Sequence, residues 1–273
     1  MGFDIYPVDL GHRNVKEIKD LVKHTEENFL NINEEDFLNL TKSLLDDSRK
    51  SVNKLAISLL KYRESMEKEI KRVTNMYNFD KVYSKDRYVI GADEVGRGPL
   101  AGPIVAAAVV LDLNNTDTKD MILGLNDSKK LAAKKRQELS EIIKKKALSY
   151  KICLINNKEI DSKGIGWCNN QVLLESSEGI ALKPSIVLSD GYKIKGISLP
   201  NKAVVKGDSK SASIACASIL AKVYRDNIMI EYSNAYEGYG FHKNMGYGTE
   251  EHIKAIKSRG ITSIHRMSFL KNI

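Results

Sequence analysis

The stretch YVIGADEVGRGPLAGPIVAAAVVL, residues 88–111, contains two apolar segments separated by a glycine-rich turn. Residues 88–92 are typical of a short buried strand, and residues 104–111 form a β-branched and alanine-rich run suited to a central strand. Two acids, Asp93 and Glu94, directly follow the first segment. Stability alone gives little reason for an acid pair at this position, so the stretch points to both a fold and a site.

The sequence around this stretch alternates between strand and helix patterns. Further strands are expected at residues 150–155, 186–188 and 203–205, and helices at residues 131–148, 168–182, 212–232 and 249–258. This alternation predicts an α/β fold with a mixed central β-sheet flanked by helices. The helix at 212–232 is dense in Ala and Ile, and we expect it to be buried.

The N-terminal third has a different pattern. Apolar residues recur at three- and four-residue spacing, which predicts helices over residues 15–28, 34–45 and 47–77. Asn33 is a suitable N-cap for the second of them. The composition becomes polar and irregular at residues 78–86. We therefore expect an all-helical N-terminal extension over residues 1–82 and an α/β domain over residues 83–273.

Composition excludes several classes of protein. The 273 residues are 42% hydrophobic and 29% charged, as in ordinary soluble globular proteins. No apolar run is long enough to span a membrane, and the N-terminus lacks a secretory signal pattern. The three cysteines have neither disulfide-framework nor zinc spacing, so we expect reduced thiols and a cytoplasmic location.

The net charge of +8 is unevenly distributed. Residues 1–86 carry nearly equal numbers of acidic and basic residues, so the basic excess lies in residues 87–273. A basic surface on the α/β domain suits a partner that carries phosphate groups. Many basic proteins bind no nucleic acid, so charge alone does not decide the partner.

Two further acids also follow predicted strands. Asp190 follows residues 186–188, and Asp208 follows residues 203–205. Sites in α/β folds collect beyond strand ends, where converging carboxylates repel one another unless a cation neutralises them. Ligand sets made only of oxygen favour Mg²⁺ or Mn²⁺. Four such carboxylates on a basic domain suggest metal-assisted phosphodiester cleavage.

Each of these features also has a purely structural interpretation. Asp208 precedes two serines and suits a helix N-cap, and Asp190 with Gly191 is an ordinary turn dipeptide. The glycine-rich turn at residues 96–103 fits a tight hairpin with a structural Arg97. A generic hairpin, however, does not explain the acid pair that precedes it.

Six blocks together resemble the signature of the type 2 ribonuclease H family, the bacterial ribonucleases HII. They are DEVGRGPLAGP (93–103), NDSKKL (126–131), DG (190–191), KGDSKSASIA (206–215), GYGT (246–249) and IHRMSF (264–269). The resemblance spans about residues 87–270, with the blocks in the family's order. It implies a ribonuclease H-like three-layer fold. The helical N-terminal stretch resembles the extension of some bacterial members.

The resemblance implies a role for each matching residue. The catalytic and metal-binding carboxylates are Asp93, Glu94, Asp190 and Asp208. The residues expected to bind substrate are Gly96, Arg97 and Gly98, which read a ribose 2′-hydroxyl, Tyr247, which packs under the adjacent sugar, and Lys129 and Lys210, which contact phosphates. The His265–Arg266 pair is as well explained by a role in the fold, and we assign it no catalytic role.

The implied activity is hydrolysis of the RNA strand of RNA–DNA hybrids and cleavage 5′ of ribonucleotides embedded in duplex DNA. Two divalent ions, Mg²⁺ or Mn²⁺, would serve the reaction, which leaves 5′-phosphate and 3′-hydroxyl ends. We expect a monomer that does not bind membranes. Two alternatives stay open: another ribonuclease H-like nuclease or resolvase acting on DNA junctions, and a hybrid-binding protein that has lost catalysis.

Overall fold

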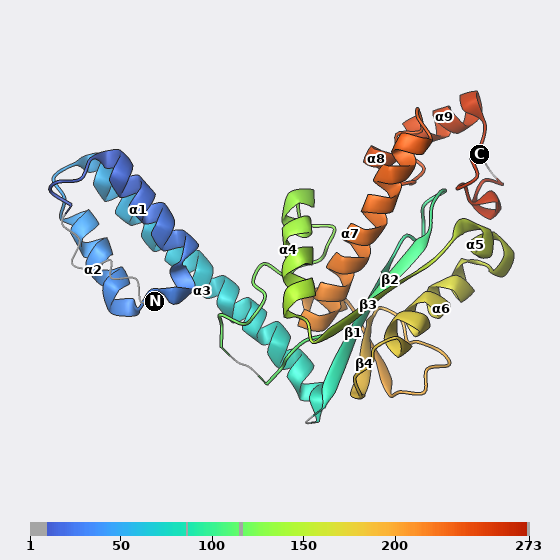
Figure 1. The fold of residues 1–273 in the computed structure, drawn as a ribbon, viewed down its shortest axis with the longest axis horizontal. Coiled ribbons are helices and arrows are strands. Elements are labelled where there is room, and N and C mark those ends of the chain that lie inside the picture. The colour runs from blue at the N-terminus through green and yellow to red at the C-terminus, as the bar shows by residue number, and fades with distance from the viewer. Residues whose placement is uncertain (1–9, 86, 115–116, 272–273) are drawn as a thin grey trace. The chain divides into compact units, whose positions relative to one another are not determined.

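The computed structural model describes residues 10–85, 87–114 and 117–271. Its helices are α1 (Val15–Glu27), α2 (Glu34–Leu45), α3 (Lys50–Ser84), α4 (Ala133–Lys146), α5 (Asn157–Lys163), α6 (Ile165–Glu178), α7 (Ala212–Ala235), α8 (Phe241–Asn244) and α9 (Glu250–Arg259) (Figure 1). Its strands are β1 (Tyr88–Val95), β2 (Ile104–Val110), β3 (Ser149–Ile155), β4 (Pro184–Asp190) and β5 (Asn201–Val204).

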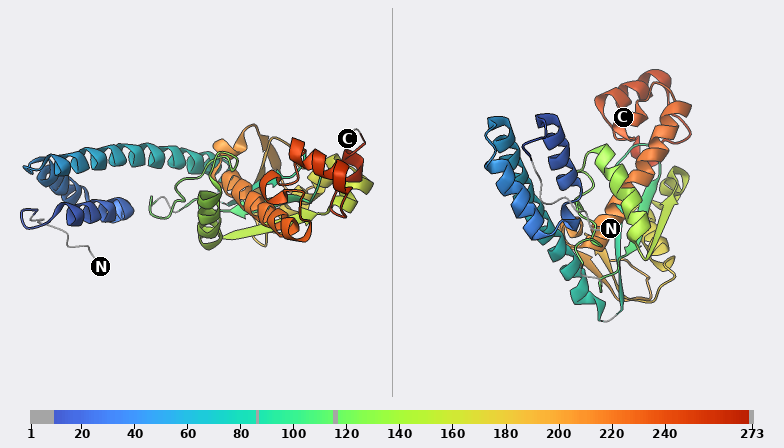
Figure 2. Two further views of the ribbon diagram at one scale, coloured as in Figure 1. Left: turned by 90° about the horizontal axis from the view of Figure 1, so that it is seen from above. Right: turned by 60° about the vertical axis from the view of Figure 1, so that its left-hand side comes forward.

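The first two helices begin at the predicted residues, and the third, predicted from residue 47, begins at Lys50. The side chain of Asn33 accepts a hydrogen bond from the N–H of Asp36, which confirms this residue as the N-cap of α2. Asn14 and Glu17 form a reciprocal capping box at the start of α1. Figure 2 shows α1, α2 and the first half of α3 side by side. Their shared core contains Leu10, Ile18, Val22, Phe37, Leu40, Leu44, Val52, Ala56 and Leu59.

The chain divides into two compact units. The helical unit comprises the described residues of 1–74 and 117–123, and the α/β unit comprises those of 75–116 and 124–273. The division falls within α3, which continues without interruption to Ser84. The expectation of irregular structure from residue 78 is therefore wrong. The end of α3 stays helical because its buried residues, among them Met76 and Tyr77, contribute to the α/β unit.

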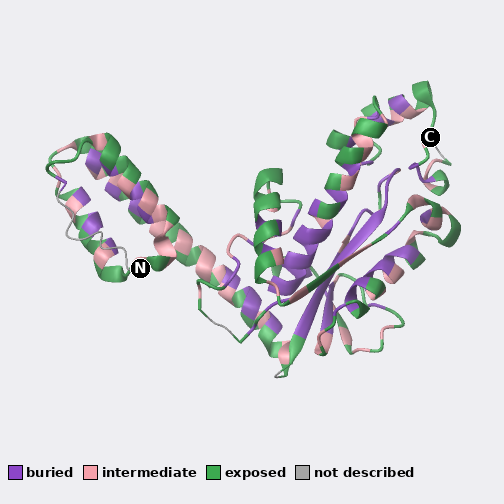
Figure 3. Cartoon of the chain, viewed as in Figure 1, coloured by how far each residue is buried: buried purple, intermediate pink, exposed green. Residues whose placement is uncertain are grey.

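A five-stranded sheet forms the centre of the α/β unit, in the order β3-β2-β1-β4-β5. β1 pairs antiparallel with β2 and parallel with β4, so the sheet is mixed as predicted. Figure 3 shows that β1 and β2 are almost completely buried. Because β1 lies at the middle of the sheet, residues at its end have β2 on one side and β4 on the other.

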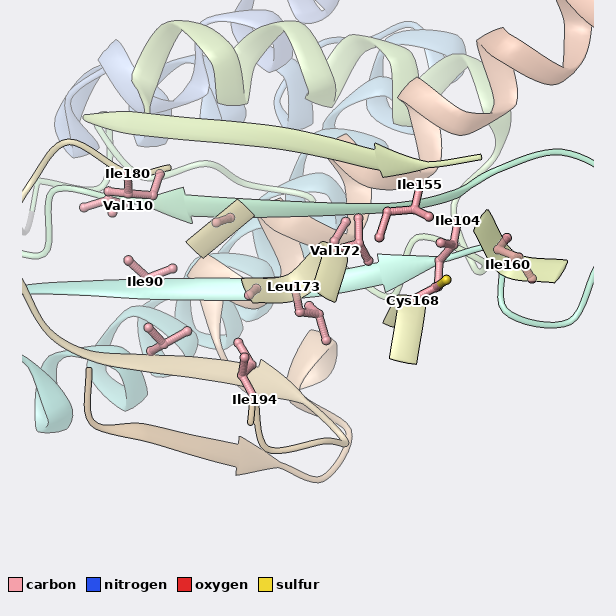
Figure 4. Close-up of a cluster of buried hydrophobic side chains, with 14 residues drawn as sticks. Ile90, Ile104, Val110, Ile155, Ile160, Cys168, Val172, Leu173, Ile180 and Ile194 are labelled. Carbon is pink, nitrogen blue, oxygen red and sulfur yellow. The ribbon is translucent and has the colours of Figure 1, made fainter. Parts of the chain in front are cut away.

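Helices cover both faces of this sheet. On one face, α5 and α6 pack on alternate residues of the strands, and Figure 4 shows the apolar core between them, from Ile90 of β1 to Val172 of α6. On the other face, α7 packs against β1 and β2, and α4 packs on α7. A Cβ at Gly91 of β1 would lie 2.1 Å from the carbonyl carbon of Ser213, so glycine is needed where α7 meets the sheet. The predicted three-layer α/β fold is confirmed.

Two local elements differ from the sequence-based expectation, and the first of them affects the site. β1 extends to Val95, because residues 90–95 pair with 105–110 of β2, so Asp93 and Glu94 lie inside the strand and not after it. The short helix α5 was not predicted, because its seven residues are too few to display a helical period.

In the part of the chain that the structure describes, no helix has the length and apolar character needed to cross a bilayer.

Candidate active site

Three of the predicted acids lie at the ends of two neighbouring parallel strands. Asp93 and Glu94 are near the end of β1, and Asp190 is the last residue of β4. The register pairs Ala92 with Ser189, so the next residues, Asp93 and Asp190, lie at the same level of the sheet. Parallel pairing therefore brings together acids that are almost a hundred residues apart in the sequence.

The fourth acid comes from the short 3₁₀ turn at Gly207–Ser209, just before α7. The N–H of Gly207 donates a 2.7 Å hydrogen bond to Oδ1 of Asp190, which fixes this turn against β4. Asp208 is half-buried, and Ser211 caps α7 by accepting from the N–H of Ile214. The structural interpretation of Asp208 as a helix N-cap is therefore wrong, because Ser211 has that role.

A cavity of about 260 Å³ unites these acids with most of the other predicted residues. It is lined by Asp93, Glu94, Val95, Gly96, Arg97, Gly98, Ser128, Lys129, Asp190, Gly191, Tyr192, Asp208, Ser218 and Tyr247. Lys210, the remaining sequence candidate, is exposed and does not line the cavity. The structure thus brings together every predicted site residue except Lys210.

The acids of this cavity are held where ionisation is unfavourable. Burial, followed by the charge of Glu94, raises the pKa of Asp93 well above its usual range. Burial also raises the pKa of Glu94 to about 7. The pKa of Asp208 is raised as well, by burial and by the charge of Asp190. Such a cluster favours any ligand that adds positive charge.

The residues present fit a hard divalent cation. Oε2 of Glu94 is buried and has no hydrogen-bond partner, while Oε1 lies 3.8 Å from Nη1 of Arg97. An orphaned carboxylate oxygen in an oxygen-only donor set suits Mg²⁺ or Mn²⁺. Across the described residues, no group of three or more His, Cys, Asp and Glu side chains is already gathered closely enough to hold a metal ion. The acids thus line the cavity without forming a preassembled ligand cluster.

The glycine-rich turn, residues 96–103, connects β1 to β2, and its first three residues line the cavity. Gly96 has a φ of +95°, and a Cβ there would lie 2.4 Å from Nε of Arg225, so only glycine fits. Gly98 lies beside Tyr247, because a Cβ at Gly98 would be 3.8 Å from Cε1 of that ring. The predicted loop and the predicted tyrosine therefore face the same space.

Sequence reasoning missed five residues of the cavity: Val95, Gly191, Tyr192, Ser128 and Ser218. The Tyr192 ring lies under the Arg97 guanidinium, 4.5 Å from ring centroid to Cζ, and is half exposed. Ser218 of α7 donates a 3.0 Å hydrogen bond to Ser128. Tyr192 directly follows Asp190 and Gly191, so its position after a candidate acid was the available signal. Ser128 lies in the quoted block NDSKKL, but no role was assigned to it, and Ser218 carried no signal because only the packing of α7 on the sheet brings it to the site.

Two family models match the chain: Ribonuclease HII over residues 90–272, and Ribonuclease HII N-terminal domain over residues 14–84. The Ribonuclease HII of Clostridium perfringens (strain 13 / Type A) is 56% identical over 265 residues, which cover 97% of this chain and 96% of that protein. That of Clostridium acetobutylicum is 53% identical over 258 residues, which cover 94% and 98%.

Solved structures give the same result at lower identity. The ribonuclease H2 of Pyrococcus horikoshii OT3 superposes with a TM-score of 0.57 at 25% identity, covering 66% of this chain and 93% of that one. The RNase HII of Archaeoglobus fulgidus, from a PCNA:RNase HII complex, has a TM-score of 0.54 at 25% identity and covers 68% and 95%. Sequence, fold and relatives agree: the chain belongs to the ribonuclease HII family of endoribonucleases.

Proposed function

We propose that this endoribonuclease hydrolyses the RNA strand of RNA–DNA hybrids and cuts 5′ of ribonucleotides embedded in duplex DNA, leaving 5′-phosphate and 3′-hydroxyl ends. One observation carries the proposal. A single cavity holds Asp93, Glu94, Asp190 and Asp208 together with the glycine-rich turn and Tyr247. Carboxylates supply a place for cations at a phosphodiester, and the turn supplies groups that can contact a ribose 2′-hydroxyl.

Asp93, Glu94, Asp190 and Asp208 would hold two divalent ions, Mg²⁺ or Mn²⁺. When bound, the ions would supply charge neutralisation at the phosphate and an acidified water. The carboxylates also orient the attacking water. Asp93 is buried and Glu94 is partly buried where they line the cavity, so few other groups compete for their oxygens.

The remaining residues of the cavity position the nucleic acid. Gly96, Arg97 and Gly98 would contact the 2′-hydroxyl, and the exposed ring of Tyr247 would pack against the adjacent deoxyribose. Lys129 is exposed at the rim of the cavity, where its ammonium group suits a backbone phosphate. Lys210 would contact phosphate outside the cavity.

We also propose that the chain works as a cytoplasmic monomer. Cys153, Cys168 and Cys216 are free thiols, as a reducing compartment favours. Light scattering of the purified chain at several concentrations tests the monomer: a mass near 30.6 kDa at all of them supports it, and a mass that rises with concentration contradicts it.

A cleavage assay with four end-labelled substrates tests the function. The substrates are a uniform RNA–DNA hybrid, a DNA duplex with one ribonucleotide, an all-DNA duplex and an all-DNA four-way junction. We expect Mg²⁺- or Mn²⁺-dependent cutting of the first two only, with 3′-hydroxyl products that a DNA polymerase extends. Cutting of the junction without the hybrids would favour a resolvase. Binding without cutting would mean that catalysis has been lost.

A further inference from the structure

Two arginines of the α/β unit are completely buried. Arg225 lies on α7, and Arg266 lies in the segment after α9, and the exposed fraction of both is 0%. Among the described residues, neither guanidinium forms an ion pair with a carboxylate; all of their hydrogen bonds go to backbone carbonyls. Burying a guanidinium costs free energy unless its N–H groups are hydrogen-bonded. The carbonyls that accept from each arginine therefore show which segment of the chain that arginine holds in place.

Arg266 donates all three of its hydrogen bonds to the glycine-rich turn. Nη2 donates to the carbonyl of Gly96 at 2.7 Å, Nη1 to that of Arg97 at 3.1 Å, and Nε to that of Gly102 at 2.9 Å. Two of these carbonyls belong to the segment that faces the cavity. The guanidinium therefore lies directly behind the cavity wall.

The backbone around Arg266 is fixed to the same turn. The N–H of Arg266 donates to the carbonyl of Leu100 at 2.8 Å, and the N–H of Gly102 donates to that of Ile264 at 2.9 Å. Ala101 and His265 form a β-bridge between these two bonds. Main-chain and side-chain bonds thus fix the position of Arg266 relative to the turn.

Peptide geometry gives these bonds a consequence at the cavity. The carbonyl of Gly96 shares its peptide with the N–H of Arg97, and the carbonyl of Arg97 shares its peptide with the N–H of Gly98. In a planar trans peptide the C=O and N–H point in opposite directions, so both N–H groups point away from Arg266. Neither of them donates to another described residue. Two adjacent free donors are therefore held on a wall of the cavity.

We propose that Arg266 is a positioning residue that orients the N–H groups of Arg97 and Gly98 toward the 2′-hydroxyl of the scissile nucleotide. The inference rests on the proposed function. Because Arg266 is fully buried, it acts through these two peptides and does not touch the substrate. Its positive charge at both carbonyls also polarises the peptides, which strengthens their N–H groups as donors.

Arg225 provides a matched control. It is equally buried and also donates three hydrogen bonds to carbonyls, those of Pro103, Met245 and Ala101, at 2.9, 2.9 and 3.2 Å. None of these carbonyls belongs to the peptides of the Arg97 or Gly98 N–H. Replacing either arginine by lysine removes a buried fork of donors, but only Arg266→Lys frees the two peptides that face the cavity.

The test combines enzyme variants with substrate variants. Wild type, Arg266→Lys and Arg225→Lys are compared by their Kd for duplexes that contain one ribonucleotide or one 2′-fluoro nucleotide, which lacks the hydroxyl, and binding is measured without Mg²⁺ or Mn²⁺ so that neither duplex is cut. We expect Arg266→Lys to raise the Kd about tenfold for the ribonucleotide duplex and less than about twofold for the fluoro analogue, as the loss of one oriented hydrogen bond suggests. Arg225→Lys should lower the melting temperature and keep the ratio of the two Kd values within about twofold of wild type.

Equal losses of affinity for both duplexes in Arg266→Lys, or an equal change of the ratio in Arg225→Lys, would overturn the inference. Nuclear magnetic resonance of the wild-type chain gives a second measurement if Arg266→Lys does not fold. The amide signals of Arg97 and Gly98 should shift with a ribonucleotide duplex and not with an all-DNA duplex, and absence of that difference overturns the inference. A wild type that shows no preference for ribonucleotides would instead refute the proposed function.

Discussion

The helical unit and the α/β unit differ in what they bury. Among the described residues of the helical unit, the buried polar side chains are Thr25 and Thr41, and each donates to a carbonyl one helical turn back. Over the residues that the structure describes, the buried Asp, Arg and His side chains are all in the α/β unit: Asp80, Asp93, Arg225, Asp226, His252, His265 and Arg266.

This difference follows from what each unit has to do. An apolar core with self-satisfied threonines stabilises helices at little electrostatic cost. Buried charges destabilise a fold unless they are paired or serve a site, so their concentration in one unit marks where chemistry takes place. Substitutions of buried charges in the α/β unit should therefore change activity and stability in different directions or by different amounts. Substitutions in the helical unit should change stability alone.

The largest effect is expected for Asp93→Asn. Loss of a central carboxylate should lower turnover more than about a thousandfold, because the cations lose a ligand. The same change should raise the melting temperature of the metal-free chain, since burial and Glu94 disfavour the charged form of Asp93. Steady-state cleavage and calorimetry measure the two quantities.

A matched variant of the helical unit is Thr41→Val, which should leave turnover unchanged. Hybrid affinity of Asp93→Asn should stay near that of wild type, because most affinity comes from phosphate contacts. Near-normal turnover of Asp93→Asn would mean that this acid is not a catalytic ligand.

Ionisation of Asp80 with rising pH is expected to lower the free energy of unfolding by about 3 kcal/mol. Burial raises the pKa of this carboxyl from 3.8 to about 6, although its Oδ2 accepts a 2.8 Å hydrogen bond from the N–H of Ser213. The folded state thus binds the proton more tightly than the unfolded state. The contribution of Asp80 to stability is present below pH 4, falls as the pH rises to about 6, and is constant above.

Denaturant unfolding of wild type and Asp80→Asn at pH 4 and pH 8 isolates this group. Asparagine can still accept from Ser213 but does not ionise, so the wild type should lose about 3 kcal/mol relative to the variant between the two pH values. A difference between the two proteins that is the same at both pH values would show that Asp80 is not buried as a carboxylate in the fold.

A smaller effect is expected for Tyr247→Ala. This variant should cut a duplex with one ribonucleotide about ten- to hundredfold more slowly, because it loses a hydrogen bond and packing against the sugar. The ring is 42% exposed at the cavity, so its removal should hardly change the melting temperature. Parallel rates on a uniform hybrid serve as the comparison. Equal losses on both substrates with a lowered melting temperature would make Tyr247 a structural residue of the turn between Gly246 and Gly248.

The smallest effect is expected when residues 1–74 of the helical unit are removed. A chain that starts at Asn75 should keep kcat and change KM by no more than about threefold, less than 1 kcal/mol, because every residue of the cavity is in the α/β unit. A chain that starts at Ser84 also loses Asp80 and the buried Met76 and Tyr77, so it should melt at a lower temperature. Loss of kcat in a folded chain starting at Asn75 would show that the helical unit takes part in catalysis.

Local pattern predicted most of the elements. The Asn33 cap, the first two helices and the buried helix α7 came directly from residue type and spacing, because capping and helical periodicity are decided within a few turns. Residues 78–84 looked irregular because the one fully buried residue among them, Asp80, accepts its hydrogen bond from Ser213 of α7, a contact that no local window contains.

The sequence alone determined the α/β class, through the alternation of strand and helix patterns along the chain, and it determined the candidate acids and the glycine-rich turn, which lie in short contiguous patterns. Only the tertiary structure decided which residues meet. Parallel pairing of β1 with β4 aligned Asp93 with Asp190, and packing of α7 on the sheet placed Ser218 beside Ser128. Arg266 gave no sign of its contacts with Gly96 and Arg97, because its partners are backbone carbonyls about 170 residues earlier, and a carbonyl has the same chemistry at every position of the chain.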